Sequence, residues 1–151
     1  MASINIGRVV AGGLVAGVVA NAIDFVTNTY ILAADWQALA VAHNMDPAAM
    51  TSPAVAGTWV AVDFAYGILL VLTYAAIRPR FGAGAATAIY AGLMVFAAPT
   101  LVLLGFTEMG LLTMTLFITG SVAGIVSTLA ASVAGAAVYK EADSPAPAYA
   151  R

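Results

Sequence analysis

The sequence predicts an all-α fold, an integral membrane four-helix bundle with both termini cytoplasmic. Of its 151 residues, 63% are hydrophobic and only 8% are charged, whereas soluble domains carry roughly 25% charged residues. Four apolar stretches are each long enough to cross a bilayer. The basic residues then all fall on one side of the membrane, as they do in multi-pass proteins.

Each apolar stretch exceeds the ~20 helical residues that a ~30 Å hydrocarbon core requires. The predicted spans are about residues 9–32, 54–77, 83–104 and 109–139. Together they form one domain, residues 1–141, with the lipid bilayer as the solvent for most of its surface.

Local signals support these limits. Ser52 and Pro53 offer the second span an N-cap and a proline in its first turn. The segment "RPRFGAG" (78–84) predicts a break between the second and third spans, and "GFTEMG" (105–110) predicts a short turn before the fourth. Residues 142–151 are polar and proline-rich, and we expect them to form a disordered tail.

The basic residues determine the predicted orientation. With four spans, five of them share one side: Arg8, Arg78, Arg80, Lys140 and Arg151. The other side carries acidic residues and a histidine but no Lys or Arg: Asp35, His43, Asp46 and Glu108. Because positive loops stay in the cytoplasm, this second side is predicted to be the outer one.

An N-terminal signal peptide is the alternative interpretation of the first span. Arg8, the apolar run and "ANA" (20–22) loosely fit that format. However, the run continues to Leu32, and cleavage would place Arg78 and Arg80 on the same side as a translocated N-terminus. We therefore expect the first span to be retained.

Residues 33–52 form the one long connection. Within it, residues 35–44 predict either a short helix, capped by Asp35 and with Trp36 and Leu39 on one face, or an irregular loop. The sequence alone does not decide between the short helix and the irregular loop.

Small residues mark the predicted helix contacts, because close packing rather than hydrophobicity brings helices together in lipid. The first span has Gly13-x-x-x-Gly17 and the fourth has Gly120-x-x-x-Gly124. We expect these four glycines to lie where helices pack. The same stripes suit a homo-oligomer or a larger membrane complex.

Polar residues continue the first of these stripes. Gly13, Gly17, Asn21, Asp24 and Asn28 follow one another at spacings of four, four, three and four residues. Such spacing places them on one helical face, so Asp24 is expected to point into the bundle.

A second acid lies at a similar depth. Asp24 precedes Leu32 by eight residues and Asp63 follows Ala54 by nine, which places both roughly 12–13 Å below the outer end of their helices at ~1.5 Å per residue. Tyr66 shares the face of Asp63. The candidate polar site, for a proton, an ion or a polar network, therefore consists of Asp24, Asp63, Asn21, Asn28 and Tyr66.

Two acids at this depth need an explanation, since a charge at the bilayer centre costs at least ~2.5–3.5 kcal/mol and the spans hold no Lys or Arg. One acid can be protonated, the two can share a proton, or a cation or a water-filled pocket can solvate them. A proton- or cation-linked site and a purely structural hydrogen-bonded network both remain possible.

Other chemistry is disfavoured. The chain has no cysteine, which excludes disulfides, thiolate metal sites and iron–sulfur clusters. A single histidine argues against haem or zinc, and a net charge of −2 does not indicate a nucleic-acid partner. We expect no metal and no cofactor.

Three segments carry a family resemblance: "GRVVAGGLVAGVV" (7–19), "YAAIRPRFGAG" (74–84) and "AGAAVYKE" (134–141). They resemble an uncharacterised family of small bacterial four-span integral membrane proteins with no assigned activity. In that family an acid follows an Asn in the first span, which corresponds to Asp24 after Asn21. The resemblance implies a multi-pass protein of the bacterial cytoplasmic (inner) membrane and no catalytic or ligand role.

Three hypotheses of function remain. The first is a small proton- or cation-linked transporter or channel, acting as a homo-oligomer with a polar site in the outer half of the bundle. The second is a non-catalytic accessory subunit of a larger membrane complex. The third is an intramembrane enzyme with Asp24, Asp63 and Tyr66 as acid and base groups. The sequence has no nucleophile, metal or cofactor motif, so we do not expect an enzyme.

Overall fold

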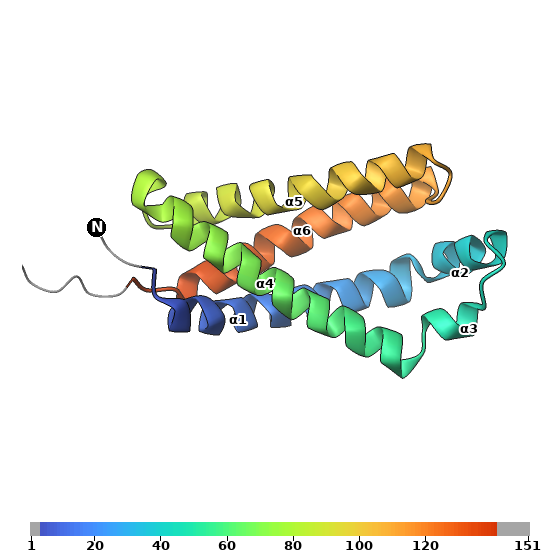
Figure 1. Ribbon diagram of the computed structural model, residues 1–151, viewed down its shortest axis with the longest axis horizontal. Helices are drawn as coiled ribbons and strands as arrows, with labels where there is room; N and C mark the ends of the chain where they lie inside the picture. Colours follow the sequence, from blue (N-terminus) through green and yellow to red (C-terminus); the bar gives the residue numbers. More distant parts are fainter. Residues whose placement is uncertain (1–3, 142–151) are drawn as a thin grey trace, which may run out of the picture.

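The computed structural model describes residues 4–141, and within them it contains four helices long and apolar enough to cross a membrane. This confirms the predicted all-α, four-helix membrane-type fold (Figure 1). The long helices are α1 (Ile6–Val26), α4 (Pro53–Phe81), α5 (Ala85–Glu108) and α6 (Met114–Val138). A π-helical turn, η1 (Thr27–Ile31), extends α1, and two short helices, α2 (Ala33–Ala42) and α3 (Pro47–Met50), lead to α4. The predicted tail at 142–151 lies outside the described residues.

The second span is longer at its C-terminal end than the sequence predicted. α4 continues through Pro79 to Phe81 and stops at Gly82, whose φ of 85° is left-handed backbone that glycine adopts without strain. Pro79 lies in the last turn, so it removes only the hydrogen bond to the carbonyl of Ala75. A proline this close to a helix end does not have to break the helix.

The turn between the third and fourth spans lies later than predicted. α5 runs through Gly105 to Glu108, and the connection occupies residues 109–113 instead of 105–110. Gly110 supplies a positive φ of 74° in this turn. The Thr113 hydroxyl then accepts the N–H of Leu116 at 3.2 Å and caps α6.

The N-cap of α4 and the long connection before it largely agree with the sequence predictions. The Ser52 hydroxyl accepts the N–H of Val55 at 3.4 Å, which confirms the predicted cap. The helical alternative holds for the connection, but α2 begins at Ala33, so Asp35 lies in its first turn and does not cap it. Leu39 on α2 is buried, together with Leu116 of α6.

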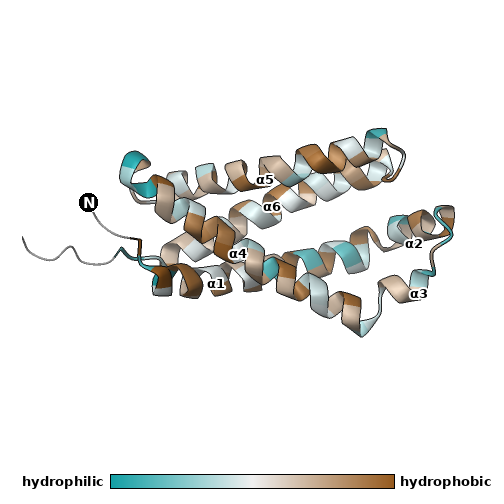
Figure 2. Cartoon of the chain, viewed as in Figure 1, coloured by the Kyte–Doolittle hydropathy of each residue, from teal (hydrophilic) through white to brown (hydrophobic). Residues whose placement is uncertain are grey.

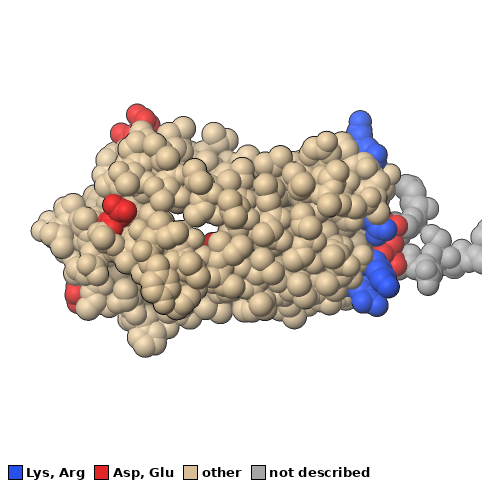
Figure 3. Space-filling view, turned by 180° about the vertical axis from the view of Figure 1, so that it is seen from behind, with Lys and Arg blue, Asp and Glu red and all other residues tan. Residues whose placement is uncertain are grey.

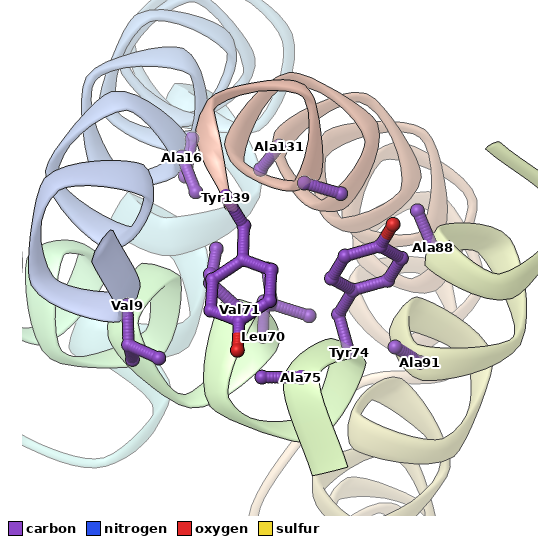
Figure 4. Packing of buried hydrophobic residues seen from close by; sticks show 12 residues of the cluster. Val9, Ala16, Leu70, Val71, Tyr74, Ala75, Ala88, Ala91, Ala131 and Tyr139 are labelled. Atoms are coloured by element: carbon purple, nitrogen blue, oxygen red, sulfur yellow. The ribbon is translucent and has the colours of Figure 1, made fainter. Parts of the chain in front are cut away.

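Close backbone contact holds one half of the bundle together. A Cβ atom added at Gly12 of α1 would lie 2.6 Å from the carbonyl oxygen of Gly135 on α6. The surrounding core consists of small and branched side chains, including Val9, Ala16, Leu70, Val71, Ala88 and Ala131 (Figure 4). In the same cluster the rings of Tyr74 and Tyr139 meet edge to face, with ring centroids 5.9 Å apart.

The two ends of the bundle carry opposite charge (Figure 3). The basic end holds Arg8, Arg78, Arg80 and Lys140, together with Glu141, whose carboxylate lies 3.5 Å from the Arg78 guanidinium. The acidic end holds Asp35, Asp46 and Glu108. Between the ends the helices consist mainly of hydrophobic residues, many of them exposed, and hydrophilic residues occur in the acidic-end half of α1 (Figure 2).

Candidate functional site

A crevice opens between the long helices in the half of the bundle toward the acidic end. It consists of two cavities. The deep cavity, of about 220 Å³, lies nearer the middle of the bundle, beside Tyr66 and Thr128. The shallow cavity, of about 210 Å³, lies nearer the acidic end, beside Leu32 and Trp36. The two are adjacent, because both are lined by Asp24, Leu103, Gly120, Ser121 and Gly124. In the space-filling view this half of the molecule is hollowed, and an acidic side chain is visible at the edge of the opening (Figure 3).

Asp24 is the central residue of the crevice. It lies on α1 one turn before the π-helical segment and is the only carboxylate among the described residues that lines both cavities. Ser127 of α6 lines the deep cavity together with it. Asp24 therefore faces the crevice, as its place in the polar stripe of α1 predicts.

Asp63 and Tyr66 approach the deep cavity from α4. They lie three residues apart on one helical face, and both line the cavity together with Asp24. The Tyr66 hydroxyl lies 3.3 Å from the hydroxyl of Thr128 on α6. This pair forms the floor of the crevice, since Tyr66 also packs against the buried core of the basic-end half.

The two asparagines have different places. Asn28 lines the shallow cavity, donates to the carbonyl of Asp24 at 2.9 Å and accepts the indole N–H of Trp36 at 2.9 Å, so it joins α1 to α2. Asn21 lines neither cavity. Its amide donates to the carbonyls of Gly17 at 2.9 Å and Val60 at 3.4 Å, so it ties α1 to α4.

The α6 side of the crevice contains hydroxyl groups that were not predicted to belong to the site. Ser121, Ser127 and Thr128 all line the deep cavity. The Ser121 oxygen is buried and has no hydrogen-bond partner among the described residues. A signal was present, since Gly120, Gly124 and Ser127 recur at helical spacing as a face of small residues on one helix.

The four predicted packing glycines divide into two pairs. At Gly13 and Gly17 the backbone of α1 meets α4, with added Cβ atoms 2.6 Å from the Cα of Ile68 and 2.8 Å from that of Phe64. Gly120 and Gly124 do not bring two backbones together within the described residues, so their predicted role in helix packing stays a prediction. Nothing lies closer than 4.0 Å to an added Cβ at Gly120, and at Gly124 the nearest atom, 3.3 Å away, belongs to the Phe96 ring.

The glycines that do bring α6 to α1 and complete the α1–α4 contact were not predicted. They are Gly12, Gly67 and Gly135, and at each of them an added Cβ would lie under 3.0 Å from backbone atoms of a facing helix. The glycines on α6 therefore have two roles, because Gly135 closes the basic-end half while Gly120 and Gly124 line the crevice.

The carboxyl groups of Asp24 and Asp63 have no basic partner among the residues that line the crevice. No Lys or Arg among the described residues lines either cavity. Residues 4–141 also contain no cluster of three or more His, Cys, Asp or Glu side chains that would hold a metal ion. Two carboxylates with hydroxyls and aromatic rings around them can therefore accept a proton or a positively charged ligand.

Comparison with protein-family models, with curated proteins and with solved structures finds no match to this chain. The resemblance to small four-span bacterial membrane proteins therefore stays a prediction. The function has to be inferred from the crevice itself, its charge and its position between the two ends of the bundle.

Proposed function

We propose that this chain is a multi-pass transporter of the bacterial cytoplasmic membrane that binds a proton or a cation in the crevice. The observation that supports this is the convergence of Asp24 of α1 and Asp63 of α4 on one cavity that no described Lys or Arg lines. Ionisable residues inside membrane proteins commonly mark ion or proton pathways.

The chemistry of the lining favours a cationic occupant. A carboxylate within a membrane-spanning bundle must be neutralised or solvated, at a cost of at least ~2.5–3.5 kcal/mol otherwise. The side chains around the two acids, Tyr66, Ser127 and Thr128, are neutral. Their oxygens can ligate a cation or orient a proton, but they cannot balance the charge.

The shape of the bundle favours a transporter over an open channel. Beyond the Tyr66–Thr128 pair the interior is closed by Leu70, Val71 and Ala131, each 0% exposed. A central site that is sealed toward one end of the bundle is compatible with alternating access. A channel would need a continuous path.

We also propose that the chain acts as a homo-oligomer, since a sealed basic-end half leaves little room for a path within one copy. Native mass spectrometry after extraction in a mild detergent tests this. Multiples of the chain's own mass support the homo-oligomer. A monomer, or a complex made only with other proteins, contradicts it.

The orientation that fits this function places the basic end in the cytoplasm and the crevice toward the outside. Because the chain has no cysteine, a single introduced thiol reports on one position. Ala83→Cys near the basic end and Ala38→Cys on α2 are exposed sites. In intact cells a membrane-impermeant maleimide should label only Ala38→Cys. Labelling of Ala83→Cys instead would reverse the orientation.

Flux through the purified protein tests the function directly. In liposomes, proton uptake under a potassium diffusion potential is followed with an internal pH dye, and sodium uptake with a radioactive tracer. We expect flux in the native protein and a loss of at least about ten-fold in Asp24→Asn and Asp63→Asn. Glu108→Gln removes an exposed carboxylate outside the crevice and is the matched control.

Two results would contradict the proposal. One is the absence of flux of a proton or of any cation tested, organic ammonium ions included, in the native protein. The other is flux in Asp24→Asn and Asp63→Asn that equals that of Glu108→Gln, when all three variants elute as the native protein does.

A further inference from the structure

We infer that the natural ligand of the crevice is a small organic ammonium ion, with its charged head at Asp24 and Asp63 and its apolar body in the shallow cavity. This inference rests on the proposed function, because it names the class of cation that the same site takes. The size of the crevice and the carboxyl and aromatic groups of its lining support it.

The volume of the crevice exceeds the needs of an inorganic ion. The two adjacent cavities measure about 220 Å³ and about 210 Å³, whereas a water molecule occupies only ~30 Å³. A dehydrated cation such as Ca²⁺ is held by six to eight oxygen atoms in a tight shell. The described residues offer no such cluster of acidic or histidine ligands.

The lining combines carboxyl groups, aromatic rings and apolar side chains. The deep cavity holds both carboxyl groups together with Tyr66 and Phe96, and aromatic faces near carboxylates favour ammonium groups through cation–π attraction. The shallow cavity shares Asp24 and adds apolar side chains for the body of the ligand. These are Leu32, Trp36, Leu103, Leu112, Leu116 and Phe117.

Small residues on α6 create the space that joins these two environments. Gly120 lines both cavities, and an added Cβ there would meet only the end of Leu32, 4.0 Å away. One ligand can therefore extend from the deep cavity into the shallow one.

Isothermal titration calorimetry on the full chain in detergent tests the inference. The probe is benzylammonium, and benzyl alcohol is its uncharged analogue of similar shape. Sodium and potassium chloride are titrated separately. We expect saturable binding of benzylammonium and no saturable binding of benzyl alcohol, because only the ammonium group can pair with the carboxylates of Asp24 and Asp63.

Variants separate the charge from the space. Asp24→Asn should weaken benzylammonium binding by about ten-fold or more. Gly120→Leu keeps both carboxylates but fills the junction of the cavities, so it should also abolish binding. Gly57→Leu is its matched control, because nothing lies within 4 Å of an added Cβ at Gly57 and the residue lines neither cavity.

The possible outcomes distinguish this inference from the proposed function. Binding of sodium or potassium at Asp24 without benzylammonium binding would overturn the inference and leave cation transport standing. Equal binding of benzyl alcohol, or undiminished benzylammonium binding in Gly120→Leu, would also overturn it. Absence of any cation binding together with absence of flux would overturn both. If Asp24→Asn does not fold, Gly120→Leu against Gly57→Leu still decides the matter.

Discussion

Replacing Gly67 with alanine is expected to force α4 away from α1, because the two helices meet backbone to backbone at this glycine. An alanine Cβ would collide with the carbonyl oxygen of Gly13 and would lie 2.6 Å from the amide nitrogen of Gly17. Both atoms belong to the backbone of a helix, so no side-chain rotation relieves the contact.

The size of the effect follows from this geometry. Ordinary contact begins near 3.4 Å, so the helices must separate by about 0.8 Å to relieve the 2.6 Å approach. Such a shift also loosens the neighbouring contacts of Gly13 with Ile68 and of Gly17 with Phe64. Overpacking of this kind costs about 1–3 kcal/mol, which is a large part of a typical folding free energy.

Unfolding of the protein from mixed micelles with increasing sodium dodecyl sulfate, followed by circular dichroism, gives the free energy of unfolding. Gly57→Ala on the same helix is the control, because an added Cβ there meets nothing within 4 Å. Both variants share the helix preference of alanine, so their difference isolates the packing cost. Equal stability of Gly67→Ala and Gly57→Ala would refute the close backbone contact.

Three further variants test individual contacts. Ser132→Ala loses a buried hydrogen bond of 2.7 Å to the Ala88 carbonyl and should lower the unfolding free energy by about 0.6–1.7 kcal/mol, whereas unchanged stability contradicts that bond. Arg78→Gln should cost about 1–2 kcal/mol, because the mostly buried guanidinium loses an ion pair of 3.5 Å with Glu141 and its place over the Tyr139 ring, and unchanged stability would argue against both contacts. Trp36→Phe loses its bond to Asn28 and should speed hydrogen exchange in α2 with little change in global stability, and unaltered exchange would exclude a stabilising role.

The fold was predictable because the bilayer restricts the choices. A long apolar run in a bilayer has no water to form hydrogen bonds with its backbone, so it must form a helix. The positions of the basic residues then predict which helix ends lie on the same side. Helix limits depend on weaker local effects. The sequence predicts a turn that starts at Gly105, yet α5 continues through this residue, since a single glycine costs a helix only about 1 kcal/mol relative to alanine.

The candidate site was predictable from α1 and α4 but not from α6. Asp24, Asp63 and Tyr66 follow from depth and from helical spacing, both of which are properties of a single helix. Which face of α6 meets them depends on how that helix is rotated in the bundle, and this rotation is set at the Gly12–Gly135 contact. The π-helical turn at Thr27–Ile31 also changes the phase of α1 beyond Asp24, and no sequence pattern indicated it.

The glycines of α6 show why a small-residue motif alone does not predict a helix contact. A glycine permits close approach, but whether a neighbour approaches depends on the side chains of the facing helix. Opposite Gly135 lies another glycine, Gly12, and the two backbones touch. Opposite Gly124 lies the Phe96 ring, and α5 is held away. The same residue type therefore seals one half of the bundle and leaves the other half hollow, at the depth where Asp24 and Asp63 lie.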